Sequence, residues 1–196
     1  MAYAVIFAGG TGTRMKSTGL PKQFLEIEGR ALIQHTLDPF LQSPRIDGIV
    51  IVSLESWIDH MRSLVKDLLG DKVIDVVPGG ATGQLSIYAG LDRLRGIAGD
   101  DVVLIHDGVR PMIDVDLIDR CIASVEEHGS AITGIPVFET PLESADGKLI
   151  DRILDRSQAW IAQAPQAFRH SAIISCHDRA LAEGRTDFID SCSMWR

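Results

Sequence analysis

Hydrophobic residues along this chain fall into short continuous runs that alternate with segments of helical period. The runs are rich in valine and isoleucine, which is typical of strands buried on both faces. They occupy residues 2–8, 48–53, 72–77, 101–105 and 130–137. Elsewhere, apolar residues recur every three or four positions, which predicts amphipathic helices. These cover residues 31–41, 55–69, 84–94, 114–127 and 171–183. Asp114 is the expected N-cap of the fourth helix.

The alternation of strands and helices predicts an α/β fold. Continuous apolar strands joined by helices form a parallel sheet with helices on both faces. Such sheets bind ligands at the carboxyl ends of their strands, so the loops after the first and fourth strands are candidate ligand loops. Residues 139–156 interrupt the alternation, because they are polar and contain an Asp146-Gly147 turn. This segment predicts a hairpin arm on a single domain that spans residues 1–196.

Composition excludes several classes of function. The chain has 196 residues and a net charge of −8, which disfavours non-specific binding to nucleic acid. No apolar run approaches the roughly 20 residues that a membrane span requires. The N-terminal apolar run has no basic region before it, so it predicts a strand and not a signal peptide. Cys121, Cys176 and Cys192 form no C-x-x-C motif, which favours reduced thiols in a cytoplasmic protein over a zinc site.

The loop after the first strand is rich in glycine and is followed by two cations. Residues 8–14 read AGGTGTR, and Lys22 follows eight positions after Arg14. The spacing fits neither the Rossmann glycine motif nor a Walker A loop. Backbone N–H groups of such a loop can approach a phosphate, which arginine and lysine then neutralise. The alternative is a tight turn with two solvated cations, and the loop alone leaves both interpretations open.

Several segments together resemble one enzyme family, the sugar-alcohol phosphate cytidylyltransferases. They are AGGTGTRM (8–15), PKQFLEIEGRALIQHTL (21–37), PGGATGQLSIYAGL (78–91), HDGVRP (106–111), PVFET (136–140), LDRSQAWIAQAPQAF (154–168) and TDFIDSCSMW (186–195). The resemblance implies a three-layer α/β/α sandwich of the nucleotide-diphospho-sugar transferase type, with a protruding β-arm at about 137–156. It implies transfer of CMP from CTP to a polyol phosphate with release of pyrophosphate. It also implies a divalent cation such as Mg²⁺, and a homodimer whose arm crosses to the second subunit.

The resemblance also implies a role for individual residues. Arg14 and Lys22 would be catalytic, because they can stabilise the charge on the phosphoryl oxygens. Residues that would bind the nucleotide are Phe7, Ala8, Gly9, Gly10, Thr11, Gly12, Gly80, Ala81, Thr82, Ser86, Asp107 and Gly108. Asp107 would also bind the metal. Residues that would bind the acceptor are Arg110, Thr140, Arg156 and Thr186.

Some of these residues have purely structural alternatives. Ser86 could satisfy the backbone of its own helix, and Arg156 could form an ion pair with a neighbouring carboxylate. His106 is expected to pack or to form hydrogen bonds and not to act as an acid or base. Trp160 and Trp195 are expected to pack in the core or at an interface.

Four departures from the family bear on the acceptor and on activity. The chain has Ala-Gly-Gly at 8–10 where methylerythritol enzymes usually have Ala-Ala-Gly, and Thr140 is followed by PLES with no lysine. Both details favour D-ribitol 5-phosphate over 2-C-methyl-D-erythritol 4-phosphate of isoprenoid biosynthesis. Gly83 replaces a usual arginine, and the family's C-terminal segment of several tens of residues has no counterpart here.

These departures predict a truncated or divergent chain with weakened turnover. They leave two further alternatives, which are a CTP-binding pseudoenzyme and a nucleotidyltransferase for another base.

Overall fold

The computed structural model describes residues 1–10, 19–66, 68 and 72–195. A six-stranded sheet forms its centre, with the strand order β5-β4-β1-β6-β10-β7. The strands, in that order, are Val73–Pro78, Gly48–Ser53, Ala2–Ala8, Val102–Asp107, Trp160–Arg169 and Ser130–Pro136. The five predicted strands are therefore present, close to their predicted bounds.

The sheet is mixed, so the prediction of a purely parallel sheet was wrong. β5, β4, β1 and β6 run parallel, whereas β10 is antiparallel to both β6 and β7. The hydrophobic pattern did not reveal β10, because its first half is exposed and it contains polar residues and Pro165. The strand enters the sheet after the arm returns, and this return path reverses its direction.

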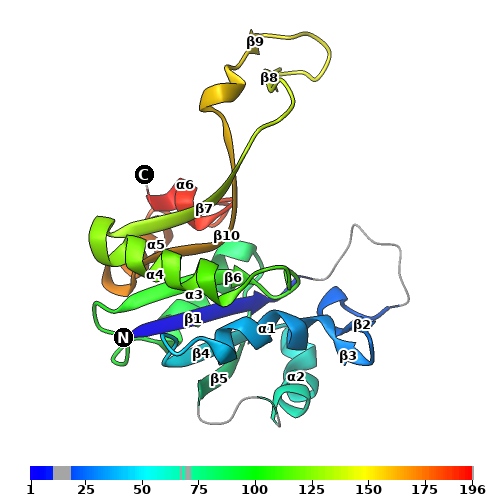
Figure 1. Cartoon of the computed structure of the whole chain (residues 1–196), viewed down its shortest axis with the longest axis vertical. Helices are drawn as coiled ribbons and strands as arrows, with labels where there is room; N and C mark the ends of the chain where they lie inside the picture. Colours follow the sequence, from blue (N-terminus) through cyan, green and yellow to red (C-terminus); the bar gives the residue numbers. More distant parts are fainter. Residues whose placement is uncertain (11–18, 67, 69–71, 196) are drawn as a thin grey trace.

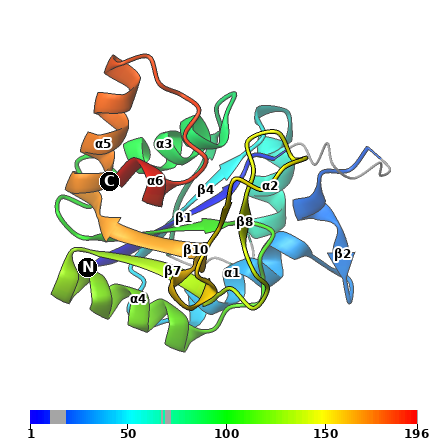
Figure 2. The ribbon, with the colours of Figure 1, turned by 90° about the horizontal axis from the view of Figure 1, so that it is seen from above.

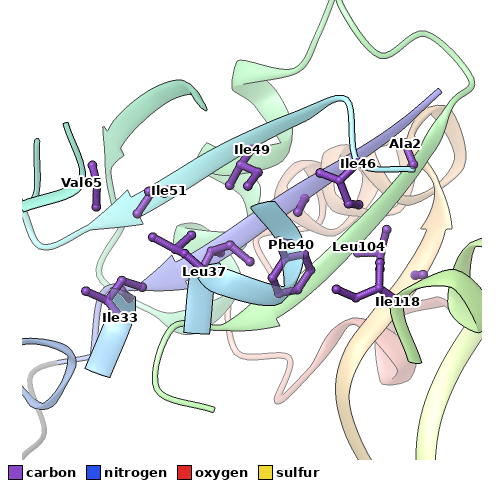
Figure 3. Close-up of a cluster of buried hydrophobic side chains, with 14 of the residues drawn as sticks. Ala2, Ile33, Leu37, Phe40, Ile46, Ile49, Ile51, Val65, Leu104 and Ile118 are labelled. Atoms are coloured by element: carbon purple, nitrogen blue, oxygen red, sulfur yellow. The ribbon is translucent and has the colours of Figure 1, made fainter. Parts of the chain in front are cut away.

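Helices cover both faces of the sheet, which confirms the predicted three-layer α/β/α sandwich. α1 (Leu32–Gln42), α2 (Ile58–Val65) and α4 (Val115–His128) lie on one face, and α3 (Gly83–Arg93) and α5 (His170–Ala182) lie on the other (Figure 2). The short helix α6 (Ser191–Trp195) packs beside α5. Figure 3 shows side chains of α1, among them Leu37 and Phe40, facing Ile49 and Leu104 of the sheet.

Individual helices match their predicted ranges with one exception. Asp114 caps α4 through a 2.8 Å hydrogen bond from the N–H of Leu117, as predicted. The helix predicted at 55–69 instead begins as a 3-10 turn, η2 (Glu55–Trp57), before α2. Another 3-10 turn, η1 (Lys22–Phe24), precedes the small hairpin of β2 (Glu26–Ile27) and β3 (Arg30–Ala31).

The predicted arm is also present. β8 (Leu142–Glu143) and β9 (Arg152–Ile153) form its hairpin, and η4 (Arg156–Gln158) leads back into β10. The arm extends away from the sheet and its helices (Figure 1). Trp195 packs against Phe168 with ring centroids 5.2 Å apart, whereas Trp160 at the base of the arm is exposed. Among the described residues, no helix is both long and apolar enough to span a membrane.

Candidate active site

The carboxyl ends of neighbouring parallel strands bring three loops to one edge of the sheet. The register pairs Phe7 with Asp107, and Ala8 with Ser53. Ser53 in turn pairs with Pro78 at the end of β5. The loops that follow β1, β5 and β6 therefore begin at the same edge of the sheet. This edge is where parallel α/β sheets bind ligands.

Lys22 reaches this edge because its neighbour Gln23 is tied to the end of β1. Gln23 is 1% exposed, and its side-chain nitrogen donates a 2.7 Å hydrogen bond to the carbonyl of Ala8. The bond holds η1 against the end of β1, and Lys22 in this turn is half-buried. Arg14, Thr11 and Gly12 lie outside the described residues.

The loop after β5 is folded back on the first turn of α3. Thr82 is the N-cap, and its hydroxyl accepts a 3.2 Å hydrogen bond from the N–H of Leu85. A Cβ at Gly80 would lie 2.4 Å from the Cβ of Leu85, so this position requires glycine. The loop thus presents the exposed backbone of Gly80 and Ala81 at the strand ends.

The Ser86 hydroxyl forms hydrogen bonds to the backbone of this loop. It donates to the carbonyl of Thr82 at 2.9 Å, lies 3.3 Å from the carbonyl of Gly80, and accepts from the N–H of Gly80 at 3.2 Å. Ser86 is buried. The hydroxyl therefore satisfies its own loop and helix, as the structural alternative expects, and its contact with a nucleotide stays a prediction.

Asp107 and Arg110 form an ion pair at the end of β6. The Nε of Arg110 donates to Asp107, and Nη1 donates to the side-chain oxygen of Gln163 at 2.9 Å. Gln163 lies where the pairing of β10 with β7 shifts register, between Ala162 and Gln166. Sequence reasoning missed Gln163 because it missed β10, although the residue lies inside the quoted AQAPQAF motif.

His106 is buried behind this turn, forms a hydrogen bond to its backbone, and does not face the site. It is fully buried, and its Nε2 lies 3.0 Å from the carbonyl of Arg110. A carbonyl can only accept, so Nε2 carries the proton. Burial lowers the pKa of His106, which keeps the ring neutral. The prediction of a packing and hydrogen-bonding role is confirmed.

A pocket of about 380 Å³ opens beside the Asp107–Arg110 pair. Its lining includes the apolar side chains of Phe7, Ile87 and Ile105, and the polar side chains of Asp107, Arg110 and Gln163. Phe7 therefore faces this pocket. Gly108 does not line this pocket; it packs against Ala8 and Ile33, and its carbonyl accepts a 3.2 Å hydrogen bond from Thr36.

The predicted acceptor residues do not all meet within one chain. Thr140 and Arg156 are exposed on the arm, which stands away from the strand ends (Figure 1). Arg156 donates to the carbonyl of Phe138 at 3.1 Å, and no carboxylate among the described residues pairs with it. The structural alternative for Arg156, an ion pair with a neighbouring carboxylate, is therefore not found, and its acceptor role stays a prediction. Thr186 lies in the coil before α6, which Gln84 attaches to α3.

The donor set at the strand ends fits a metal that arrives with a nucleotide. Asp107 provides one carboxylate, and one of its oxygens faces Arg110. The described residues contain no group of three or more histidines, cysteines and carboxylates that could hold a metal by themselves. Mg²⁺ is commonly bound by one or two carboxylates together with substrate phosphates, so a single aspartate is sufficient.

The mixed sheet and the three loops at its edge define a nucleotidyltransferase of the Rossmann-like type. The solved structure of 4-diphosphocytidyl-2C-methyl-D-erythritol synthase from Anaerococcus prevotii superposes with a TM-score of 0.85 at 26% identity, covering 99% of this chain and 80% of that one. Residues 2–195 match the family described as 2-C-methyl-D-erythritol 4-phosphate cytidylyltransferase. The chain belongs to this family, and it is a cytidylyltransferase.

Two curated relatives carry different acceptors in their names. Ribitol-5-phosphate cytidylyltransferase of Streptococcus agalactiae is 46% identical over 195 residues, which cover 99% of this chain and 82% of the relative. The 2-C-methyl-D-erythritol 4-phosphate cytidylyltransferase of Geobacter metallireducens is 39% identical over 183 residues, which cover 92% of this chain and 78% of the relative.

Proposed function

We propose that this protein transfers CMP from CTP to D-ribitol 5-phosphate and releases pyrophosphate. The observation that carries the reaction is the meeting of the three loops at one sheet edge, with Lys22 and the Asp107–Arg110 pair beside them. The 46% identity to the ribitol-5-phosphate enzyme of S. agalactiae supports the acceptor.

The nucleophile in this reaction is the phosphate of the acceptor. Its second pKa is about 6, so it is largely a dianion at neutral pH and needs no general base. The burial of His106 agrees with this, because the ring cannot reach a substrate. Catalysis then depends on positioning and on positive charge at the phosphoryl oxygens, which Arg14 and Lys22 supply. Asp107 would hold Mg²⁺ together with the phosphates of the nucleotide, and the metal would neutralise charge on the triphosphate.

The arm contributes to the active site of a second copy in this proposal. Thr140 and Arg156 would then bind the acceptor phosphate next to the partner's loops, which they do not reach within their own chain. Large exposed apolar side chains along the arm and the outer ends of β7 and β10 support a homodimer. They are Ile135, Phe138, Leu142, Leu149, Ile150, Ile153, Trp160 and Ile161.

The two sequence features that favour ribitol lie in different parts of the molecule. A Cβ at Gly9 would lie 3.2 Å from the Ser86 hydroxyl, so this position lies beside the loop between β5 and α3, which is predicted to bind the nucleotide. The segment after Thr140 is the acceptor side, and there Glu143 forms a 2.8 Å ion pair with Arg152. In this proposal the arm is the part of the molecule that distinguishes one acceptor from the other.

The alternative acceptor is 2-C-methyl-D-erythritol 4-phosphate, which the family match and the G. metallireducens relative support. With either acceptor, this proposal has the protein act in the cytoplasm, where CTP is available. The reaction requires no nucleic-acid or membrane partner.

The deciding experiment measures pyrophosphate release with CTP and Mg²⁺ and with each acceptor in parallel. We expect kcat/KM to be at least about tenfold higher for D-ribitol 5-phosphate, since mispositioned hydroxyl groups are poorly tolerated in a polar site. A preference for the methylerythritol substrate would reassign the acceptor. Thermal shifts with CTP, UTP, ATP and GTP test the base, because a ligand that binds the folded state raises its stability.

A further inference from the structure

Gln84 connects the first turn of α3 to the segment that carries Thr186. Its side chain is 3% exposed. The amide nitrogen donates to the carbonyl of Arg185 at 2.9 Å, and the amide oxygen accepts from the N–H of Phe188 at 3.1 Å. Both ends of one buried amide are thus bound to a single short stretch of backbone about a hundred residues further along the chain.

This stretch has few other attachments. It is coil between α5 and α6, where the N–H of Arg185 donates to the carbonyl of Ala180 at 2.8 Å. The guanidinium of Arg185 lies 4.1 Å from the ring centre of Phe188, so these two side chains of the segment contact each other. In the part of the chain that the structure describes, the backbone of residues 186–188 makes no hydrogen bond other than the one to Gln84. Gln84 therefore attaches the stretch that carries Thr186 to α3.

The same helical turn holds the loop between β5 and α3, residues 79–82, which is predicted to bind the nucleotide and is called here the nucleotide loop. Ser86 binds the backbone of Gly80 and Thr82, as described above. Residues two positions apart in a helix are rotated by about 200° about its axis, so Gln84 and Ser86 point to opposite sides of α3. One rigid turn thus holds the nucleotide loop with one side chain and the Thr186 segment with another.

We propose that Gln84 is a positioning residue for cytidylyl transfer, which fixes the Thr186 segment relative to the nucleotide loop. This inference rests on the proposed function, because the roles of the loop and of Thr186 come from it. Transfer requires an oxygen of the acceptor phosphate close to the α-phosphorus and in line with the leaving group. Gln84 keeps the Thr186 segment, on the acceptor side, at a constant distance from the nucleotide loop.

The test compares Gln84→Met with Gln34→Met. Methionine has a similar volume to glutamine but cannot make either hydrogen bond. Gln34 is a matched control, because its amide also donates to one backbone carbonyl, that of Leu64 at 3.1 Å, and accepts from one backbone N–H, that of Ala31 at 2.9 Å. It lies on α1, across the sheet from α3.

We expect Gln84→Met to raise the KM for the acceptor about tenfold, which corresponds to the loss of a typical buried pair of hydrogen bonds. The kcat at saturating acceptor should also fall, because the acceptor phosphate is then less well aligned with the α-phosphorus. The KM for CTP should change less than about threefold, because Ser86 still holds the loop between β5 and α3. Gln34→Met should leave all three constants within about twofold. An unchanged acceptor KM in Gln84→Met would overturn the proposal.

A second measurement does not depend on turnover. Hydrogen exchange at the Phe188 amide should be faster in Gln84→Met than in the unaltered chain, and CTP should slow this exchange in the unaltered chain only. If CTP does not change the exchange rate of the Phe188 amide in the unaltered chain, the proposal is also overturned. If no acceptor yields pyrophosphate, the proposed function fails instead, and the CTP dependence of this one amide still decides whether Gln84 couples the two segments.

Discussion

At the scale of single residues, three glutamines hold segments of the candidate site. Gln23 binds the carbonyl of Ala8, Gln84 binds the segment around Thr186, and Gln163 binds Arg110. All three lie inside motifs quoted from the sequence, but none of them was among the residues expected to bind a substrate or to act on it. A glutamine has no distinctive spacing, so its role depends on which backbone groups the fold places next to it.

Replacement of Lys22 by alanine should abolish most turnover and leave the fold intact. We expect kcat to fall about 100-fold to 1,000-fold, the typical loss when one group that stabilises a transition-state charge is removed. The melting temperature should stay unchanged, because Lys22 forms no ion pair among the described residues. Lys66→Ala is the matched control, since Lys66 is exposed at the end of α2. Equal losses in the two variants would contradict a catalytic role.

His177 should make the protein less stable in mild acid. Both of its ring nitrogens are buried without a hydrogen-bond partner among the described residues, and burial lowers its pKa to about 4. Between pH 6.5 and about 4, the histidine is protonated in the unfolded chain only, so the free energy of unfolding falls as the pH falls.

We expect this residue to remove about 2 kcal/mol of stability between pH 7.5 and pH 5. His177→Phe keeps a ring beside Tyr88 but cannot be protonated, so it should lose less stability over the same range. Urea unfolding of both proteins at the two pH values measures the difference. Parallel losses in the two proteins would show that His177 does not titrate in this way.

At the scale of elements, η1 is positioned by an aromatic cluster as well as by Gln23. Phe24 stacks on Trp57 with ring centroids 5.0 Å apart and meets the edge of His60 at 4.8 Å. Trp57 belongs to η2 and His60 to α2. The cluster therefore joins the turn that carries Lys22 to the helix that follows β4.

Replacement of Phe24 by alanine should damage stability and catalysis together. We expect a loss of about 3 kcal/mol in the free energy of unfolding, as for other buried aromatic side chains. The kcat should fall as well, because the adjacent Lys22 loses its support. Met112→Ala, at a side chain that is 93% exposed, should change neither quantity. A stable Phe24→Ala protein with normal kcat would show that η1 is held by Gln23 alone.

The elements also show which parts of the fold the sequence could predict. β1, β4 and β6 are buried along nearly their whole length, and their continuous apolar runs identified them. β10 is exposed in its first half and buried in its second, so neither a continuous nor an alternating pattern marks it. Its place between β6 and β7 depends on pairing between distant segments, which periodicity does not encode.

At the scale of the whole molecule, the arm separates the predicted acceptor residues from the rest of the site. Thr140 and Arg156 lie on or beside a hairpin that leaves the sheet (Figure 1), whereas Lys22 and Asp107 lie at its strand ends. The proposed homodimer resolves this separation, because the arm of one copy can reach the site of the other.

A complementation experiment tests this composite site. Lys22→Ala and Arg156→Ala should each be nearly inactive alone, since each destroys every site of its own homodimer. In mixed dimers, one site combines an intact Lys22 with an intact Arg156 from the other copy. An equal mixture that has exchanged subunits should therefore recover about a quarter of the unaltered activity. A mixture as inactive as its components would show that the arm acts within its own chain.

The sequence by itself determined the α/β class, the order of the helices and most strands, and the family. Continuous apolar runs, helical spacing and loop motifs are local properties, so they can be recognised without knowing what lies opposite them. Only the tertiary structure decided the mixed sheet, the Asp107–Arg110–Gln163 group and the attachment of the Thr186 segment to α3. These features join residues tens of positions apart, and such contacts form only when the chain has folded, because they depend on which backbone groups the packed elements leave within hydrogen-bonding distance.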